Sequence, residues 1–300
     1  MKFSALLATL SALLASASAY KPVLVLHGID GDANQYTNFV ADLIEEHPGT
    51  NAQALKVFEG TPTSWVQLNY QVEHIASTIN DIVSASPDDF NDGYHLVCHS
   101  QGALICRCLT EYIDTHNIDT LVSMAGPQMG VYDEAFFSFF PDSIGKLTLE
   151  EIYYVAYTSV FQDTLSVANM WSDPNHVKDY LSDNSFLPKY NNLIDHDKKE
   201  AFKTNFLSLS KAVFVVGSQA DGVTYDGGIG PWQAAIFDYY DTEGNFVDMK
   251  NQTVYTDDTF GLKTMDERGD LVLGVVEGVS HNEWFNNPDI YKKYVFPHCT

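Results

Sequence analysis

The chain has 300 residues, 45% of them hydrophobic, which is enough to bury one large core. It carries 16 Lys and Arg against 40 Asp and Glu, a formal net charge of −24, and this excess of acid argues against nucleic acid as a partner. The acidic residues are scattered rather than grouped in blocks, as on an ordinary solvated surface.

The first 19 residues have the features of a secretory signal peptide. Lys2 precedes an apolar stretch over residues 3–14, and Ala17-Ser18-Ala19 supplies a small-residue cleavage site. That stretch is too short to span a bilayer, and no later stretch approaches about 18 apolar residues, so no transmembrane segment is expected. We expect a mature protein that begins near Tyr20 and resides in the lysosome or outside the cell.

Apolar strands alternate with amphipathic helices along the rest of the chain. The predicted strands are residues 22–26, 54–58, 94–98, 120–125, 211–217 and 271–277, and the predicted helices are residues 39–44, 65–82, 103–113 and 291–296. This alternation predicts an α/β fold with a mostly parallel sheet, right-handed crossovers and helices on both faces. We expect one domain over residues 20–300.

The longest predicted helix has a clear start. Ser64 stands where a cap is needed, and Gln67 follows three residues later, which is the spacing of a capping box. Apolar residues then recur at intervals of three and four as far as Ile82. The pattern predicts that Ser64 caps this helix.

Residues 130–209 interrupt the alternation. They are rich in aromatic side chains at helical spacing and contain no clear strand; the aromatic residues are Phe136, Phe137, Phe139, Phe140, Tyr153, Tyr154, Tyr157, Phe161 and Trp171. Ordinary helical core explains most of them. An inserted helical cap over the carboxyl ends of the strands would also need such residues and would line an apolar pocket, and the two interpretations are compatible.

Residues 94–109 read as strand, sharp turn and helix, with Ser100 at the turn. Such a turn exposes the serine side chain and leaves backbone N–H groups free at the start of the helix, as in a nucleophile elbow. Gly102 fits because the helix must start close against the strand. Cys98 replaces the usual first glycine of G-x-S-x-G, so this window alone also fits a buried turn between strand and helix.

A nucleophilic serine needs a base and an acid that orients the base, and α/β hydrolases supply them in the order Ser, Asp or Glu, His. Ser100, Asp221 and His281 follow this order, and each lies just past a predicted strand. Asp226 and Asp238 lie downstream in the same connection as Asp221 and are alternatives for the acid.

The remaining histidines are weaker candidates for the base. His99 adjoins the serine but is expected to point away from the site, His27 belongs to the first loop, and His298 lies in the final residues. The oxyanion hole is expected from the backbone N–H groups of Gln101, after the nucleophile, and of Ile29, in the first loop. Ile29 could equally be a plain turn residue.

Four cysteines, Cys98, Cys106, Cys108 and Cys299, enter an oxidising compartment, and their even number permits disulfides. Cys98 could pair with Cys106 or with Cys108, or the thiols could stay free. No C-x-x-C pair is present, so we expect no metal site, and nothing suggests a cofactor. Asn251 heads the sole N-x-[ST] sequon and is the candidate glycosylation site.

From about Pro22 to the C-terminus the chain resembles the palmitoyl-protein thioesterase family, and within it the second lysosomal branch. The matching motifs are His27-Gly28, Ser100-Gln101-Gly102, Pro127-Gln128-Met129-Gly130, Asp173-Pro174, Asn205-Phe206-Leu207, Asp221-Gly222-Val223, Pro231-Trp232-Gln233, Phe260-Gly261-Leu262-Lys263-Thr264, and Ser280-His281 with Trp284. Several of them are far more specific than S-x-G. Ala103 departs from the family, which commonly has a second glycine there.

The resemblance implies hydrolysis of long-chain acyl thioesters in the lysosome, with palmitoyl-CoA or an S-acylated protein as substrate. The second branch has cysteines two residues before and six residues after its serine, which implies a disulfide between Cys98 and Cys106. The same catalytic core would serve a lipase or carboxylesterase acting on oxygen esters. A catalytically silent acyl-binding protein is the alternative from a different class, and the intact order of Ser, Asp and His argues against it.

Overall fold

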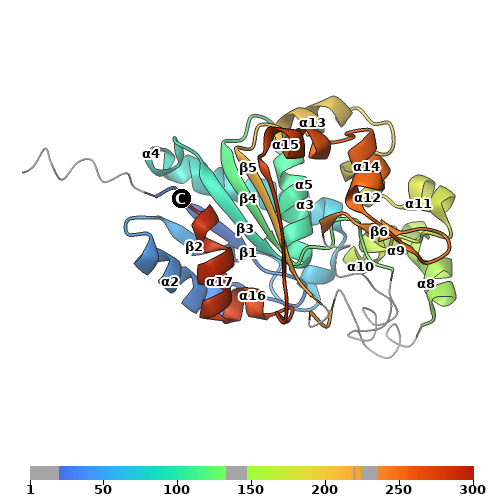
Figure 1. Cartoon of the computed structure of the whole chain (residues 1–300), viewed down its shortest axis with the longest axis horizontal. Helices are drawn as coiled ribbons and strands as arrows, with labels where there is room; N and C mark the ends of the chain where they lie inside the picture. The colour runs from blue at the N-terminus through green and yellow to red at the C-terminus, as the bar shows by residue number, and fades with distance from the viewer. Residues whose placement is uncertain (1–19, 133–146, 219–220, 224–235) are drawn as a thin grey trace, which may run out of the picture.

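A computed structural model describes residues 20–132, 147–218, 221–223 and 236–300. Its centre is a six-stranded sheet of β1 (Val23–Leu26), β2 (Ala52–Ala54), β3 (Tyr94–His99), β4 (Ile118–Met124), β5 (Lys211–Gly217) and β8 (Leu271–Val276). The strand order is β2-β1-β3-β4-β5-β8, and every neighbouring pair is parallel. Helices cover both faces (Figure 1). The predicted α/β fold is confirmed.

The α-helices are α2 (Thr37–Glu46), α3 (Leu68–Ala85), α4 (Pro87–Phe90), α5 (Gln101–Tyr112), α8 (Leu149–Ala156), α9 (Ser159–Gln162), α10 (Ser166–Met170), α11 (Val177–Asp183), α12 (Leu187–Tyr190), α13 (Lys199–Phe206), α14 (Thr253–Thr256), α15 (Leu262–Arg268), α16 (Glu283–Asn286) and α17 (Pro288–Tyr294). Short 3-10 helices occupy Ala33–Tyr36, Thr63–Trp65, Met249–Asn251 and Phe296–His298. No helix in the described ranges is long and apolar enough to cross a membrane.

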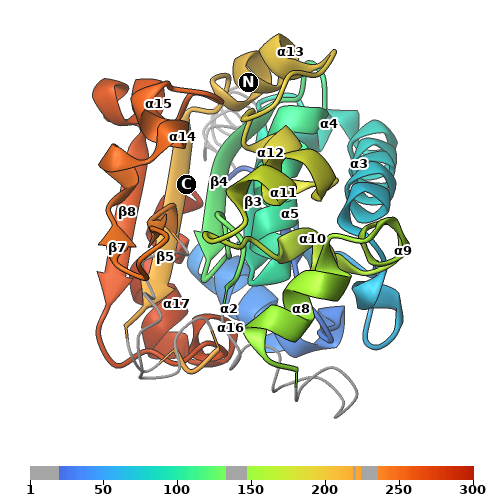
Figure 2. The same cartoon turned by 90° about the vertical axis from the view of Figure 1, so that its right-hand side faces the viewer.

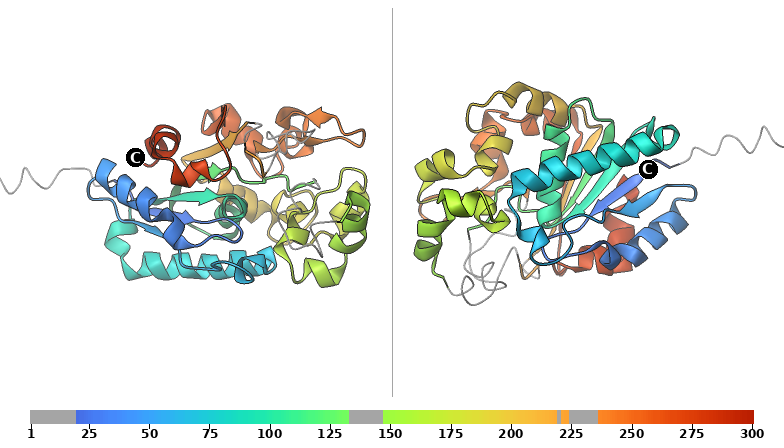
Figure 3. Two further views of the ribbon diagram at one scale, coloured as in Figure 1. Left: turned by 90° about the horizontal axis from the view of Figure 1, so that it is seen from below. Right: turned by 180° about the vertical axis from the view of Figure 1, so that it is seen from behind.

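The sheet has a hydrophobic core on each face, which explains why most positions of its strands are apolar. Along β1, Val23 and Val25 pack with α2 and α17, whereas Leu24 and Leu26 pack with α3 and α5. Figure 3 shows the two helix layers on opposite sides of the strands. Side chains alternate between the faces of a strand, so in a strand covered on both faces successive side chains enter one core and then the other.

Helices α8 to α13 lie between β4 and β5 in sequence. Helices α8 to α12 gather at one end of the molecule, away from α4, and α13 brings the chain back beside α5 to the start of β5 (Figures 1 and 2). Trp171 in this region is fully buried, whereas Tyr154 is 65% exposed. The aromatic residues predicted for the insertion therefore include both core and surface side chains. Phe136, Phe137, Phe139 and Phe140 lie outside the described residues.

Three sequence predictions were wrong in detail. Strand β2 ends at Ala54, where the predicted strand 54–58 begins. Helix α3 begins at Leu68, and Ser64 belongs to a separate 3-10 turn because Val66 is extended, with ψ at 153°. The closing helix begins at Pro288, with the Asn287 side chain at its cap, and ends before the predicted residue 296. The hairpin of β6 (Tyr239–Tyr240) and β7 (Phe246–Val247) was not predicted.

Candidate active site

Ser100 sits on the sharp turn between β3 and α5. Its backbone has φ 54° and ψ −128°, a combination that residues other than glycine rarely adopt. Two glycines allow the close packing around it. A Cβ on Gly28 would lie 2.8 Å from the Ser100 Cβ, and one on Gly102 would lie 2.2 Å from the carbonyl oxygen of His27. The turn therefore has the geometry of a nucleophile elbow.

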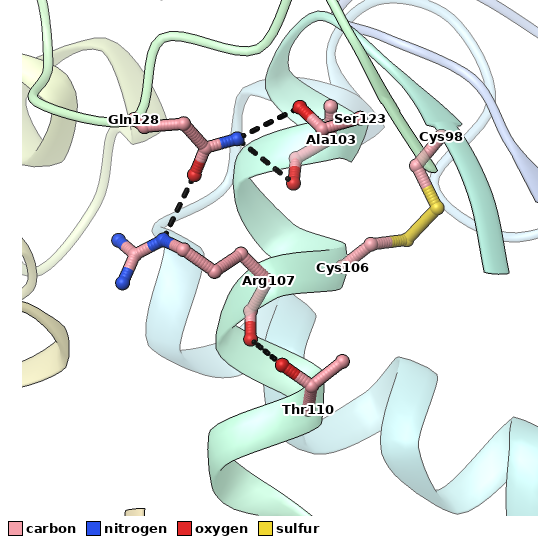
Figure 4. Close-up of a disulfide and its surroundings, with 7 residues drawn as sticks. All are labelled: Cys98, Ala103, Cys106, Arg107, Thr110, Ser123 and Gln128. Carbon is pink, nitrogen blue, oxygen red and sulfur yellow. Dashed lines mark hydrogen bonds between the residues drawn. A yellow bond between two sulfur atoms is a disulfide. The ribbon is translucent and has the colours of Figure 1, made fainter. Parts of the chain in front are cut away.

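The turn is held by a disulfide between Cys98 on β3 and Cys106 on α5, whose Cα atoms are 6.4 Å apart (Figure 4). The pairing implied by the family resemblance is confirmed. Cys108 and Cys299 are free and fully buried. Ala103, the departure from the family, is accommodated because it faces a glycine: a Cβ on Gly126 would lie 2.7 Å from the Ala103 Cβ.

His281 and Asp221 come together at the ends of neighbouring strands, β8 and β5. The Nδ1 atom of His281 lies 3.0 and 3.1 Å from the two carboxylate oxygens of Asp221. The backbone N–H of His281 also donates to the backbone carbonyl of Asp221, at 2.9 Å. Both side chains are almost fully buried. Asp221 is therefore placed to orient the His281 ring, with Nδ1 as the donor and Nε2 left free.

Of the two alternative acids, the structure describes Asp238, and its carboxylate has a different partner. Asp238 accepts a hydrogen bond from the backbone N–H of Met249, and burial raises the pKa of Asp238 to about 6. Asp226 lies outside the described residues.

His99 contacts His281, although the sequence suggested that it points away from the site. Its Nε2 donates to the backbone carbonyl of His281 at 2.8 Å, and the two ring centroids are 4.6 Å apart. Phe285 packs edge-on against the His99 ring. Burial lowers the pKa of His99 to about 3, so the imidazole stays neutral. Its contact partner is 182 residues away in sequence, and no local pattern could have revealed it.

A cavity of about 290 Å³ brings the candidate groups together. It is lined by Gly28, Ile29, Asp30, Gly31, Gln35, His99, Ser100, Val223, His281, Asn282 and Phe285. Ser100 and His281 thus face the same space. The backbone N–H groups of Ile29 and Gln101 donate to no described residue, so both are available to a ligand. The sequence predicted both as oxyanion donors.

Sequence reasoning also missed a buried polar network on α5. Arg107 is fully buried and donates to the side chains of Gln128, Glu111 and Asn191 and to the carbonyl of Tyr190. Gln128 in turn donates to Ser123 and to the carbonyl of Ala103 (Figure 4). The network ties the elbow helix to the loop after β4 and to the α12 region. Among the described residues, no group of three or more His, Cys, Asp or Glu could hold a metal ion.

Comparison with known proteins identifies the family of the chain. Residues 22–281 match the family described as Palmitoyl protein thioesterase. The chain is 34% identical to the human lysosomal thioesterase PPT2 over 93% of its own length and 88% of the relative's. It is 34% identical to lysosomal thioesterase PPT2-B of Xenopus laevis, over 97% of this chain and 96% of that protein.

Solved structures show the fold alone. A carboxyl esterase from the mycorrhizal fungus Tuber melanosporum matches with a TM-score of 0.51 at 14% identity, over 94% of this chain and 80% of the esterase. One of two fungal esterases from Rhizomucor miehei gives the same TM-score at 12% identity, over 95% of this chain and 76% of that one. The sequence matches carry the family assignment: the chain belongs to the palmitoyl protein thioesterase family and is a hydrolase of the thioesterase type.

Proposed function

We propose that this chain is a lysosomal serine thioesterase that hydrolyses long-chain fatty-acyl thioesters through an acyl-enzyme. Ser100 is the nucleophile, His281 the general base and Asp221 the residue that orients the base. The observation that carries the proposal is the His281–Asp221 hydrogen bond beside a cavity that both His281 and the strained Ser100 line. Relatives named as lysosomal thioesterases over nearly the whole chain support the reaction class.

The geometry supports a two-step reaction. The Ser100 Oγ attacks the acyl carbon while the free Nε2 of His281 takes its proton, and the Ile29 and Gln101 amides stabilise the oxyanion. The C–S bond then breaks, and the departing sulfur takes the proton from His281, which restores the neutral base and releases the thiol. A thiol, with a pKa of about 8.5, needs less protonation to leave than an alcohol does. Water, deprotonated by His281, attacks the acyl-serine and releases the fatty acid.

We assign the acyl chain to the helical insertion, which the sequence predicted as a cap over residues 130–209. Another cavity, of about 280 Å³, lies between this insertion and residues 239–254; its apolar lining includes Tyr180, Leu181 and Leu193 from the insertion, and Met129 and Val254 from outside it. Each buried methylene is worth about 0.8 kcal/mol, so the specificity constant is expected to rise with acyl length until the pocket is full. Equal efficiency for acyl chains from about 4 to about 16 carbons would count against this assignment.

The competing functions can be separated in one assay. A thioesterase turns over palmitoyl-CoA faster than a p-nitrophenyl ester, a lipase or carboxylesterase shows the reverse, and a silent acyl-binding protein hydrolyses neither. Ser100→Ala is the matched variant because it removes one oxygen atom from the proposed nucleophile. Its activity should fall by several powers of ten without loss of the fold.

The proposal also includes the localisation of the protein. Residues 1–19, which lie outside the described residues, are the proposed signal peptide, and the destination is the lysosome or the extracellular space. Asn251 and Thr253 of the sequon are both exposed, so an oligosaccharide could be attached at Asn251. Glycosidase treatment of the protein from a eukaryotic host, with Asn251→Gln as the control, tests this site.

A further inference from the structure

Ser64 contacts both segments that supply the proposed oxyanion donors. It is 1% exposed and lies on the 3-10 turn Thr63–Trp65. Its hydroxyl accepts a hydrogen bond from the backbone N–H of Asp30 at 2.9 Å, one residue after Ile29. Its carbonyl accepts a hydrogen bond from the side-chain amide of Gln101 at 2.8 Å. Ser64 lies 34 residues after Asp30 and 37 residues before Gln101, so one residue contacts two segments that are remote from it in sequence.

The Ser64 hydroxyl is the central contact on the Ile29 side. Asp30 adopts φ 57°, an uncommon conformation for a residue with a side chain, so the loop needs support to hold it. The hydroxyl that accepts from Asp30 itself donates to the carbonyl of Gly60 at 3.0 Å, which fixes its orientation. The backbone N–H of Gly60 donates to Gly31 at 2.8 Å, and the Trp65 indole donates to the Asp30 carboxylate at 2.8 Å.

The Ser64 carbonyl is the contact on the Gln101 side. It also accepts from the Gln71 side chain at 3.0 Å and from the Ser166 hydroxyl at 3.4 Å. The Gln101 Oε1 has no hydrogen-bond partner among the described residues. The hydrogen bond from Nε2 to the Ser64 carbonyl therefore holds the polar end of this side chain. The direction of the Gln101 backbone N–H depends on how this first residue of α5 is held.

We propose that Ser64 is a positioning residue that aligns the two oxyanion donors with each other, through its hydroxyl to the Ile29 loop and through its carbonyl to Gln101. The inference rests on the proposed function. The proposal also explains why Ser64, which has the spacing of a helix cap, does not cap α3: its hydroxyl is hydrogen-bonded to the backbone N–H of Asp30 instead. An oxyanion hole works only when both donors point at the same oxygen atom, and the loss of one such donor typically lowers kcat by about 10²- to 10³-fold.

The test compares two serine-to-alanine variants of the full mature chain. Ser64→Ala removes the contact to Asp30, and Ser166→Ala removes a hydroxyl that is equally buried and donates to the same carbonyl but does not reach Asp30. Palmitoyl-CoA hydrolysis is measured for both, together with melting temperature and inhibition by a trifluoromethyl ketone that mimics the tetrahedral intermediate. Ser64→Cys, of nearly the same shape but a weaker acceptor, replaces Ser64→Ala if the latter does not fold.

We expect Ser64→Ala to lower kcat by about 10- to 100-fold, part of the loss for a missing donor, with little change in KM and a matching loss of affinity for the ketone. Ser166→Ala should keep the native kcat. A purely structural role for Ser64 would lower the melting temperature of Ser64→Ala and leave its kcat and its affinity for the ketone unchanged, which would overturn the inference. If the native protein and Ser100→Ala hydrolyse the thioester equally, the proposed function itself fails instead.

Discussion

The disulfide offers a quantitative prediction about stability. Replacing Cys98 and Cys106 together by alanine removes a cross-link with a sequence separation of 8. For a loop of that length, chain entropy gives a loss of about 2.5 kcal/mol at 25 °C. Both sulfurs are buried, and removal of each costs roughly 1 kcal/mol more, on the scale of about 0.8 kcal/mol for a methylene. The double variant should therefore lose roughly 4 to 5 kcal/mol.

Cys108→Ala is the matched control. Cys108 lies on the same helix and is fully buried, but it is a free thiol, so its truncation should cost roughly 1 kcal/mol. Equilibrium urea unfolding of the three proteins, without reductant, measures the differences. With reductant present, the unfolded state of the native protein no longer has the cross-link, and the native protein should lose about 2.5 kcal/mol, the chain-entropy part of the difference. A native protein whose stability is unaffected by reductant would refute the reasoning.

Three further predictions concern two buried titratable side chains and the residue that orients His281. Burial lowers the pKa of His95 to about 4, so between pH 6.5 and pH 4 the unfolded imidazole binds a proton that the folded one does not. The free energy of unfolding should therefore fall as the pH drops through this range. In His95→Leu this fall should be smaller, as measured by urea unfolding at several pH values. Burial raises the pKa of Glu111 to about 8, so between pH 4.5 and pH 8 the folded carboxyl keeps a proton that the unfolded one releases. The free energy of unfolding should therefore fall as the pH rises through this range. The same dependence of unfolding free energy on pH in Glu111→Gln would contradict this. Asp221→Asn should lower kcat by about 10⁴-fold with KM nearly unchanged, because the amide favours the wrong imidazole tautomer; steady-state kinetics checks it.

The sequence predicted those parts of the molecule whose cause is local. The strands of the sheet, apart from β2, are visible because burial favours runs of apolar residues, as in Val23–Leu26, which is covered on both faces. The elbow at Ser100 is visible because the turn needs a small residue at Gly102. The order of Ser100, Asp221 and His281 follows from the order of the strands that carry them.

The rest depends on contacts between remote residues. The spacing of Ser64 and Gln67 is that of a helix cap, but the Ser64 hydroxyl forms its hydrogen bonds with Asp30 and Gly60 instead. His99 supports the loop of His281 across 182 residues of sequence. A two-residue strand such as Tyr239–Tyr240 is too short to produce any periodic pattern.

The central claim is that Ser100 carries the acyl group between the two halves of the reaction. The most direct measurement mixes enzyme and excess palmitoyl-CoA, quenches in acid within the first turnover and maps the acylated peptide by mass spectrometry. We predict one palmitoyl group on the peptide that contains Ser100, and none in Ser100→Ala. An acyl group on any other residue, or thioester turnover by Ser100→Ala at the native rate, would contradict the account.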